Sequence, residues 1–331
     1  YFQADPSLFI NTPEIPQGGM VVFDNRTGLL VAMQGGYGKK EANMVFNRAT
    51  DSINSPPSSI KPLGVYGPAI EEDIVTGATI IRDEEVYLDF QNPGVPWPDN
   101  WYTDEFLGDM SVRYAVKISN NIPSVKTLFQ LGVDRSKAYM KKMGIDLTND
   151  PVDLAIATGA FSYGVSPMQL GNAYKPLVNG GQYAPAKSYT KVVDADGIVL
   201  LENNPDYVSV FSPETSYMML RIMESSLLPP SPGEIMLSSA YRIGPIHNAN
   251  GEKITTSAKT GTGEKTISSW VELMTPYYSA TAWYGFDNRI WTSYLEQSEK
   301  YNMQYLLRDY MNEIHQDLAP ADWPQPAGIV A

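Results

Sequence analysis

Three short stretches of this chain carry the residues best suited to chemistry, and the first is Ser58-Ser59-Ile60-Lys61. A serine and a lysine three residues apart lie on the same face of a helix. Two prolines precede Ser58, and Pro62 has no N–H to bond back into the preceding turn, so we expect a helix to begin near Ser58. A serine hydroxyl needs a neighbouring base, and a lysine is a base only when burial or a nearby cation lowers its pKa. Taken alone, the Ser-x-x-Lys pair is equally typical of a helix-capping serine followed by a solvated lysine.

The second stretch is Ser-Asn-Asn at residues 119–121, which follows a predicted helix over residues 110–118. A hydroxyl and an amide at a helix–loop junction can relay a proton and orient a substrate amide. The same sequence is also a common turn, so alone it identifies nothing.

The third stretch is Lys-Thr-Gly-Thr at residues 259–262, in a predicted strand. Strand alternation places Lys259 and Gly261 on one face and the two threonines on the other. A glycine inside a strand often marks the close approach of another backbone. We therefore expect Gly261 to make room for the helix of Ser58, with Lys259 directed at that serine. Lys259 would then lower the pKa of Lys61 or hold an anionic group of a substrate.

The composition excludes several classes of protein. With 24 basic and 37 acidic residues, the chain has a net charge of −13, which argues against binding to nucleic acid or to an anionic membrane surface. It has no cysteine and only two histidines, so we expect no disulfide, no metal site and no cofactor. A serine enzyme of this composition would use lysine rather than histidine. There is no apolar run of about 18 residues, so we expect no membrane span among these residues.

We divide the chain into three parts. Residues 1–3, Tyr-Phe-Gln, look like the remnant of a protease-cleavable tag and are excluded from fold reasoning. Residues 4–318 are predicted to form one domain, and residues 319–331 a C-terminal tail. We expect the chain to be a fragment from which a signal or membrane anchor could have been removed.

Hydrophobic periodicity and turn signals predict strands towards both ends of the chain and helices between them. The predicted strands cover residues 19–24, 29–33, 253–262, 268–274 and 279–286, with a separate hairpin at 188–202. The predicted helices cover residues 58–71, 110–118, 125–131, 137–143, 166–177, 213–227 and 292–317, and residues 229–251 are expected to be a surface excursion. This order favours an α+β fold whose single sheet is built from both ends of the chain, with a helical lobe inserted between them.

Residues 84–109 are predicted to form a long loop rich in proline, aspartate and tryptophan. Loops of this length in compact domains are usually functional. The aromatic cluster that includes Trp97 and Trp101 can line a groove. The alternative is that these rings only anchor the loop to itself.

Taken together and in this order, the three stretches match the motif set of penicillin-binding proteins. The chain resembles the transpeptidase domain of class A (bifunctional) penicillin-binding proteins over nearly its whole length. The flanking matches are the 20–36 hairpin, Phe-Asn-Arg-Ala at 46–49, Asn-Ile-Pro at 121–123, Gly-Val-Ser-Pro at 164–167, Asn-Gly-Gly at 179–181 and the tail at 323–330. The resemblance implies the penicillin-binding-protein and serine β-lactamase-like fold: a central antiparallel five-stranded sheet flanked by helices, with an inserted all-helical lobe.

The resemblance also implies catalytic roles in acyl transfer between peptidoglycan stem peptides. Ser58 would attack the carbonyl between two D-alanines, and neutral Lys61 would take its proton, although the base is disputed in this superfamily and stays open. Ser119 would pass a proton to the leaving amine, and Asn121 would bond the substrate amide. Backbone N–H groups of Ser58 and Thr262 would form the oxyanion hole.

Substrate-binding residues follow from the same resemblance. Lys259 and the hydroxyls of Thr260 and Thr262 would hold the terminal carboxylate of the substrate. Gly261 lies between these threonines on the same strand. Independently of the resemblance, the aromatic cluster of the long loop places Trp101 in the substrate groove.

The chain departs from the family pattern at three positions. Pro57 stands where glycine is usual, which could stiffen the approach to Ser58. Ala258 stands where glycine is common, and Glu272 stands where small or apolar residues are usual. None of these changes removes a catalytic group, but we expect unusual rates with substrates or β-lactams.

Class A β-lactamases hydrolyse their acyl-enzyme with a glutamate, which that family carries in a Glu-x-x-Leu-Asn pattern between the second and third motifs. No such pattern occurs between Asn121 and Lys259. We therefore expect a long-lived penicilloyl-enzyme, which makes the protein a β-lactam target rather than a β-lactamase.

Two alternatives to a peptidoglycan DD-transpeptidase remain open. With water as the acyl acceptor the domain would be a DD-carboxypeptidase, and with its motifs kept for binding only it would be a non-catalytic penicillin-sensing or scaffold domain. The resemblance implies β-lactams as covalent ligands and the cell-wall synthesis machinery as a partner. It places the full-length protein on the extracytoplasmic face of the bacterial cell membrane, with an N-terminal glycosyltransferase domain.

Overall fold

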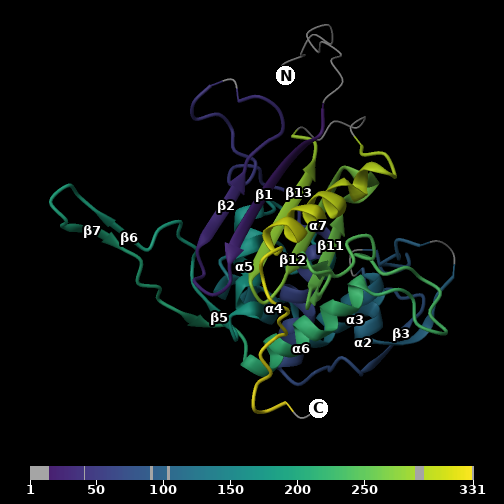
Figure 1. The fold of residues 1–331 in the computed structure, drawn as a ribbon. Coiled ribbons are helices and arrows are strands. Elements are labelled where there is room, and N and C mark those ends of the chain that lie inside the picture. Colours follow the sequence, from purple (N-terminus) through teal and green to yellow (C-terminus); the bar gives the residue numbers. More distant parts are fainter. Residues whose placement is uncertain (1–14, 41, 90–91, 103–104, 288–293, 330–331) are drawn as a thin grey trace, which may run out of the picture.

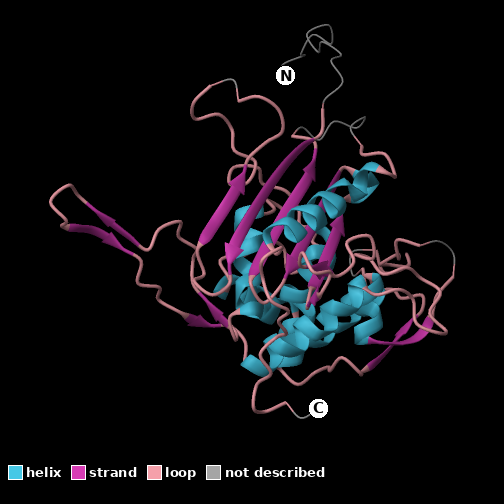
Figure 2. Ribbon diagram, in the orientation of Figure 1, coloured by secondary structure: helices cyan, strands magenta, loops and turns pink. Residues whose placement is uncertain are grey.

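The structure is a computed structural model that describes residues 15–40, 42–89, 92–102, 105–287 and 294–329, so the predicted tag remnant at 1–3 lies outside it. A five-stranded antiparallel sheet forms its centre (Figures 1 and 2). Its strands, in spatial order, are β11 (Ser257–Thr262), β12 (Ser268–Met274), β13 (Tyr278–Gly285), β1 (Gln17–Asp24) and β2 (Leu30–Gln34). The α+β class and the sheet built from both ends of the chain are thereby confirmed.

The sheet has an inner face, covered by α5, and an outer face, covered by α7 (Figure 1). On the outer face, apolar side chains of the sheet pack against α7 (Asn302–Ile314) in one buried cluster. Its members on the sheet and on α7 are Val22, Ala258, Val271, Leu273, Ala280, Ala282, Met303, Leu307 and Met311. Burial of this apolar area stabilises the domain by about 25 cal/mol per Å² removed from water.

Helices between the two sheet halves form the inserted lobe and the inner layer. They are α1 (Gly67–Glu71), α2 (Val112–Ile118), α3 (Ile122–Leu131), α4 (Val133–Lys142), α5 (Pro167–Val178) and α6 (Pro213–Glu224), with the short turns η4 (Leu154–Thr158) and η5 (Ser225–Leu227). Each of these helices falls within or beside a predicted one. The lobe also carries a two-stranded pair, β3 (Ile80–Asp83) and β4 (Gly108–Ser111), that the sequence did not predict.

The helical run at the first motif begins where predicted but changes type along its length. It consists of the 3₁₀ turn η2 (Pro57–Ile60), the π-helical turn η3 (Pro62–Tyr66) and then α1. Pro62 cannot donate a backbone hydrogen bond, so the chain closes first a tighter and then a wider turn around it.

Several predicted boundaries were wrong. The helix predicted from Met110 begins at Val112, because Met110 and Ser111 belong to β4 and the Ser111 side chain caps α2. The strand predicted over 253–262 is interrupted: β10 (Lys253–Ile254) pairs with β9 (Ile246–His247), and only β11 joins the main sheet. The helix predicted from Thr292 starts at α7, after the turn η7 (Glu299–Tyr301), and its first two residues lie outside the described ones.

The predicted surface excursion at 229–251 is only partly exposed. Ala240, Ile243 and Ile246 are buried against the outer-face cluster. The segment is rich in proline, serine and glycine, which indicated a surface loop, so the sequence did not show that it packs on the sheet.

Two further segments extend from the body. The predicted hairpin is confirmed as β6 (Lys191–Val193) and β7 (Val199–Glu202); it projects away from the domain beyond the small pair β5 (Gln182–Tyr183) and β8 (Val208–Ser209) (Figure 1). Described residues after 318 return to the body, where Trp323 is buried in the main core. Within the described part of the chain, no helix is long and apolar enough to cross a membrane.

Candidate active site

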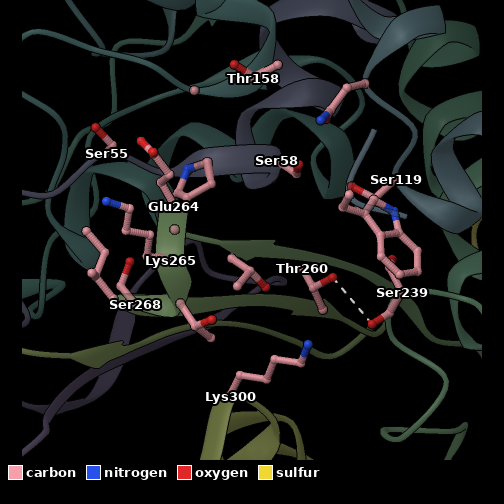
Figure 3. A pocket seen from close by; sticks show the side chains of 18 of the residues that line it. Ser55, Ser58, Ser119, Thr158, Ser239, Thr260, Glu264, Lys265, Ser268 and Lys300 are labelled. Atoms are coloured by element: carbon pink, nitrogen blue, oxygen red, sulfur yellow. Dashed lines mark hydrogen bonds between the residues drawn. The ribbon is translucent and has the colours of Figure 1, made fainter. Parts of the chain in front are cut away.

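The three motifs meet along one cavity of about 1020 Å³ (Figure 3). Its walls include Ser58 from η2, Ser119 and Asn121 from the junction after α2, and Thr260 and Thr262 from β11. Residues some 200 positions apart in sequence thus face a single space, because β11 is an edge strand of the sheet and lies beside η2.

Gly261 makes this close approach possible. A Cβ at position 261 would lie 2.8 Å from Ser59 Oγ and 3.0 Å from the Ser59 backbone nitrogen. Any larger residue would push η2, and Ser58 with it, away from the strand. The expectation that Gly261 leaves room for the first motif is confirmed.

Lys61 is completely buried. Its Nζ donates to the carbonyl oxygens of Ser119 (2.9 Å) and Asn120 (3.0 Å) and to Asn121 Oδ1 (2.7 Å). Burial lowers the pKa of Lys61 well below its usual value, and the nearby charge of Lys259 lowers it further. The predicted pKa-lowering effect of Lys259 is therefore confirmed in direction.

Ser119 connects the second and third motifs. Lys259 Nζ donates to Ser119 Oγ (2.8 Å) and to the Thr260 carbonyl oxygen (2.7 Å). Ser119 ends α2 with φ 60° and ψ 38°, a left-handed conformation that costs energy for a residue other than glycine. This backbone geometry holds the hydroxyl between Lys259 and the cavity.

Neither Lys61 nor Lys259 is part of the cavity wall. Both have an exposed fraction of 0%, and they lie behind the residues that line the cavity. We expected Lys259 to be directed at Ser58, but its hydrogen bonds direct it at Ser119 Oγ and the Thr260 carbonyl oxygen. The Ser119 hydroxyl and the β11 backbone lie between the Lys259 ammonium and the cavity, so its positive charge acts on a ligand from behind the wall.

Asn121 and the tryptophan loop form the opposite wall. Asn121 Nδ2 donates to the Asp99 carbonyl oxygen (2.8 Å), so the amide is tied to the loop as well as to Lys61. Trp97 and Trp101 both line the cavity, which confirms that this aromatic cluster faces a groove. Trp101 Nε1 also donates to the Ile118 carbonyl oxygen (2.9 Å), which fixes the loop against α2.

The cavity has a third wall that the sequence analysis missed. The Thr260 hydroxyl donates to the Ser239 carbonyl oxygen (3.4 Å), and the Arg242 guanidinium lies 3.6 Å from the centroid of the Tyr301 ring (Figure 3 shows the Thr260 contact). Other lining residues from these segments are Leu237, Ser238, Glu264, Lys265, Gln297, Lys300 and Gln304. Leu237, Ser238, Glu264 and Lys265 lie in segments without periodicity, whereas Gln297, Lys300 and Gln304 fall in the predicted C-terminal helix, which gave no sign that it reaches the cavity.

No group of three or more acidic or histidine residues in the described ranges could hold a metal ion. A helix-borne serine, two buried lysines and a wall of hydroxyls are the parts of a serine-dependent acyl-transfer site.

Comparisons with known proteins agree with this class. The family model of the penicillin-binding protein transpeptidase domain matches residues 18–292. Penicillin-binding protein 1F of Bacillus subtilis is 28% identical over 93% of this chain and 40% of its own length. Penicillin-binding protein 1A of Clostridium botulinum (strain Langeland) is 31% identical over 95% of this chain and 37% of its own. The chain belongs to the penicillin-binding protein transpeptidase domain family, and it spans about 40% of the length of these curated relatives.

Solved structures show the same fold. Penicillin-binding protein 1A of Haemophilus influenzae superposes with a TM-score of 0.78 at 22% identity, over 95% of this chain and 50% of that one. The PonA1 protein of Mycobacterium tuberculosis, solved in complex with penicillin V, gives 0.74 at 19% identity over 97% of this chain and 84% of that one. The resemblance stated from the motifs is thereby confirmed.

Proposed function

We propose that this domain is a DD-transpeptidase that joins two peptidoglycan stem peptides through a serine acyl-enzyme. The observation that carries the proposal is the convergence of Ser58, Ser119 and the hydroxyls of β11 on one cavity, with Lys61 and Lys259 buried directly behind it. Ser58 is the nucleophile, and D-alanyl-D-alanine is the donor.

In the first half-reaction, Ser58 Oγ attacks the carbonyl carbon between the two D-alanines while its proton passes to Lys61. The C–N bond then breaks, and the leaving D-alanine takes its proton through Ser119. The negative oxygen that the attack creates is bound, until the C–N bond breaks and the ester carbonyl forms, by the backbone N–H groups of Ser58 and Thr262, each such donor contributing about 2.7–4 kcal/mol. An amine of a second stem peptide attacks the ester, which forms the cross-link and restores the serine.

Proton transfer to Lys61 requires its neutral form. An ammonium fills all three acceptors that surround Lys61 Nζ, whereas a neutral amine has two N–H groups and one lone pair. Two of these acceptors are backbone carbonyls and the third is the side-chain oxygen of Asn121. When the substrate amide binds Asn121, this third contact is released and the lone pair can turn to Ser58.

The terminal carboxylate of the donor is held by hydroxyls above a buried cation. Ser119, Thr260 and Thr262 line the cavity, and Lys259 lies beneath them. Gly261 allows this strand to approach η2, and Trp101 forms the facing wall. In the full-length protein this chemistry takes place on the extracytoplasmic face of the cell membrane, beside a glycosyltransferase domain and within the cell-wall synthesis machinery.

The test is incubation of the protein with a stem-peptide mimic, with and without an acceptor amine. A transpeptidase releases D-alanine and forms the cross-linked product when the amine is present. Release of D-alanine without any cross-link would make the domain a carboxypeptidase. No release at all from a protein that still binds penicillin would make it a non-catalytic sensor or scaffold.

A further inference from the structure

A buried acid lies beside the site and has no part in the mechanism above. Glu272 is on β12, directly opposite Lys259 on β11, so their Cβ atoms are about 4.5–5.5 Å apart. Both side chains are on the inner face of the sheet, and the exposed fraction of Glu272 is 1%.

The surroundings do not explain why a carboxylate is buried there. Along β12, its neighbours on the inner face are Trp270 and Met274, both buried. One carboxylate oxygen accepts a hydrogen bond from the Thr281 hydroxyl, and the other has no hydrogen-bond partner among the described residues. A buried carboxylate with a single neutral donor is strongly unfavourable unless a cation offsets it.

Among the described residues, few charged or titratable groups lie around Glu272. Lys259 faces it from β11, Tyr174 faces it from α5, and Lys61 lies beyond Lys259 at the start of η3; β13 contributes only Thr281. Burial lowers the pKa of Lys259, and Glu272 acts in the opposite direction. Burial raises the pKa of Glu272, and Lys259 opposes that change. Each group therefore favours the charged form of the other.

We propose that Glu272 is a positioning residue that serves as the counter-ion of Lys259 and keeps this lysine cationic during catalysis. The buried cluster then contains one anion, one cation and one neutral amine. With Lys259 charged, the next proton is disfavoured on Lys61, which stays available as the base. Glu272 thus favours the charged form of Lys259 and, through that charge, the neutral form of Lys61. This inference rests on the proposed function, because it concerns the pH range in which that site works.

The test is the pH profile of the second-order rate constant of acylation by benzylpenicillin. Loss of activity at high pH reports the deprotonation of Lys259, because the neutral amine no longer attracts the ligand carboxylate. In Glu272→Gln and in Glu272→Leu we expect this basic limb to move to lower pH by about one unit or more. The two variants should agree, because both remove the charge, and Leu suits the apolar surroundings if Gln fails to fold. Glu313→Gln, an exposed glutamate on α7, is the control and should leave the profile unchanged.

A penicillin methyl ester separates this role from a merely structural one. The ester has no carboxylate for Lys259 to attract, so the ratio of wild-type to Glu272→Gln rates at pH 8.5 should fall from about tenfold towards one. The inference would be overturned if folded variants and wild type had the same pH profile of acylation. It would also be overturned if Glu272→Gln lost the same rate with benzylpenicillin and with its methyl ester. Both outcomes leave wild-type acylation intact, so they differ from failure of the proposed function, in which the wild-type protein is not acylated.

Discussion

The two faces of the central sheet are made by the same strands but have opposite contents. The outer face buries Val271 and Leu273 against α7 in an apolar cluster. The inner face, one residue away along each strand, buries Lys259, Glu272 and Thr281 in a row across β11, β12 and β13. Strand alternation alone separates the two environments.

This difference shows that the buried ionisable groups and most of the apolar burial lie on different sides of one sheet. The outer face contributes most of the apolar burial, and only at the edge strand β11 does it reach the cavity, through Thr260 and Thr262. The inner face bears the desolvation of two lysines and a glutamate, which is unfavourable for folding but shifts their pKa values. Substitutions on the two faces should therefore have separable effects on acylation and on unfolding.

The largest effect on chemistry is expected at Lys61. In Lys61→Ala, acylation by benzylpenicillin should fall by about 10²–10⁴-fold, because the base is lost, while the protein still folds. Stopped-flow acylation and thermal unfolding measure the two properties. Lys175→Ala is the matched control, since Lys175 is buried on α5 outside the cavity wall and should affect stability only. Acylation of Lys61→Ala within about tenfold of wild type would mean that another group is the base.

The largest effect on stability is expected on the outer face. Leu273→Ala should lower the free energy of unfolding by about 2–5 kcal/mol, because it opens a cavity under α7. The acylation rate of the folded fraction should not change. Leu306→Ala, at an exposed position of α7, should change stability by less than about 0.5 kcal/mol. A large loss of acylation in folded Leu273→Ala would contradict the expectation that this outer-face substitution affects stability alone.

An intermediate effect on both properties is expected at Gly261, where the inner face meets η2. The new Cβ in Gly261→Ala would displace Ser59 and Ser58, so we expect about 1–3 kcal/mol of destabilisation and about 10²-fold slower acylation. Gly94→Ala is the control, since a Cβ at that position meets nothing within 4 Å. Unchanged acylation in Gly261→Ala would show that the strand and the serine are not closely coupled.

The smallest effect is a shift in pH dependence. Acylation requires neutral Lys61, so its rate falls as acidification protonates this lysine. Lys259 lowers the pKa of Lys61, and its removal in Lys259→Met raises that pKa. In a plot of the acylation rate against pH, normalised to its maximum, the acidic limb should therefore move to higher pH. A limb that stays in place, or moves to lower pH, would show that the two lysines do not interact.

Much of this arrangement could be predicted from the sequence, because its signals are local. Period-two alternation located the main strands, and Gly261 marked the close approach of η2. The pair β3 and β4 was missed because the strands are four residues each and β3 is mostly solvent-exposed, which leaves no hydrophobic period. The contact of Lys259 with Ser119 was also unpredictable, since it depends on how α2 ends against β11.

The third wall of the cavity could not be predicted either, because its position depends on tertiary packing. Ser239 and Arg242 lie in a segment rich in proline and serine, which indicated a surface loop. Its burial depends on Ala240 and Ile243 contacting the outer-face cluster, a tertiary effect that no short window records. The charged row on the inner face was visible only as an unusual glutamate, because cross-strand partners are set by register and not by sequence distance.

The most direct test of the account is the mass of the intact protein after incubation with benzylpenicillin, followed by peptide mapping. We predict a single, long-lived penicilloyl adduct on Ser58, no adduct in Ser58→Ala, and one stoichiometric burst with a chromogenic cephalosporin. An adduct on another residue, labelling that persists in Ser58→Ala, or sustained turnover of the cephalosporin would contradict it.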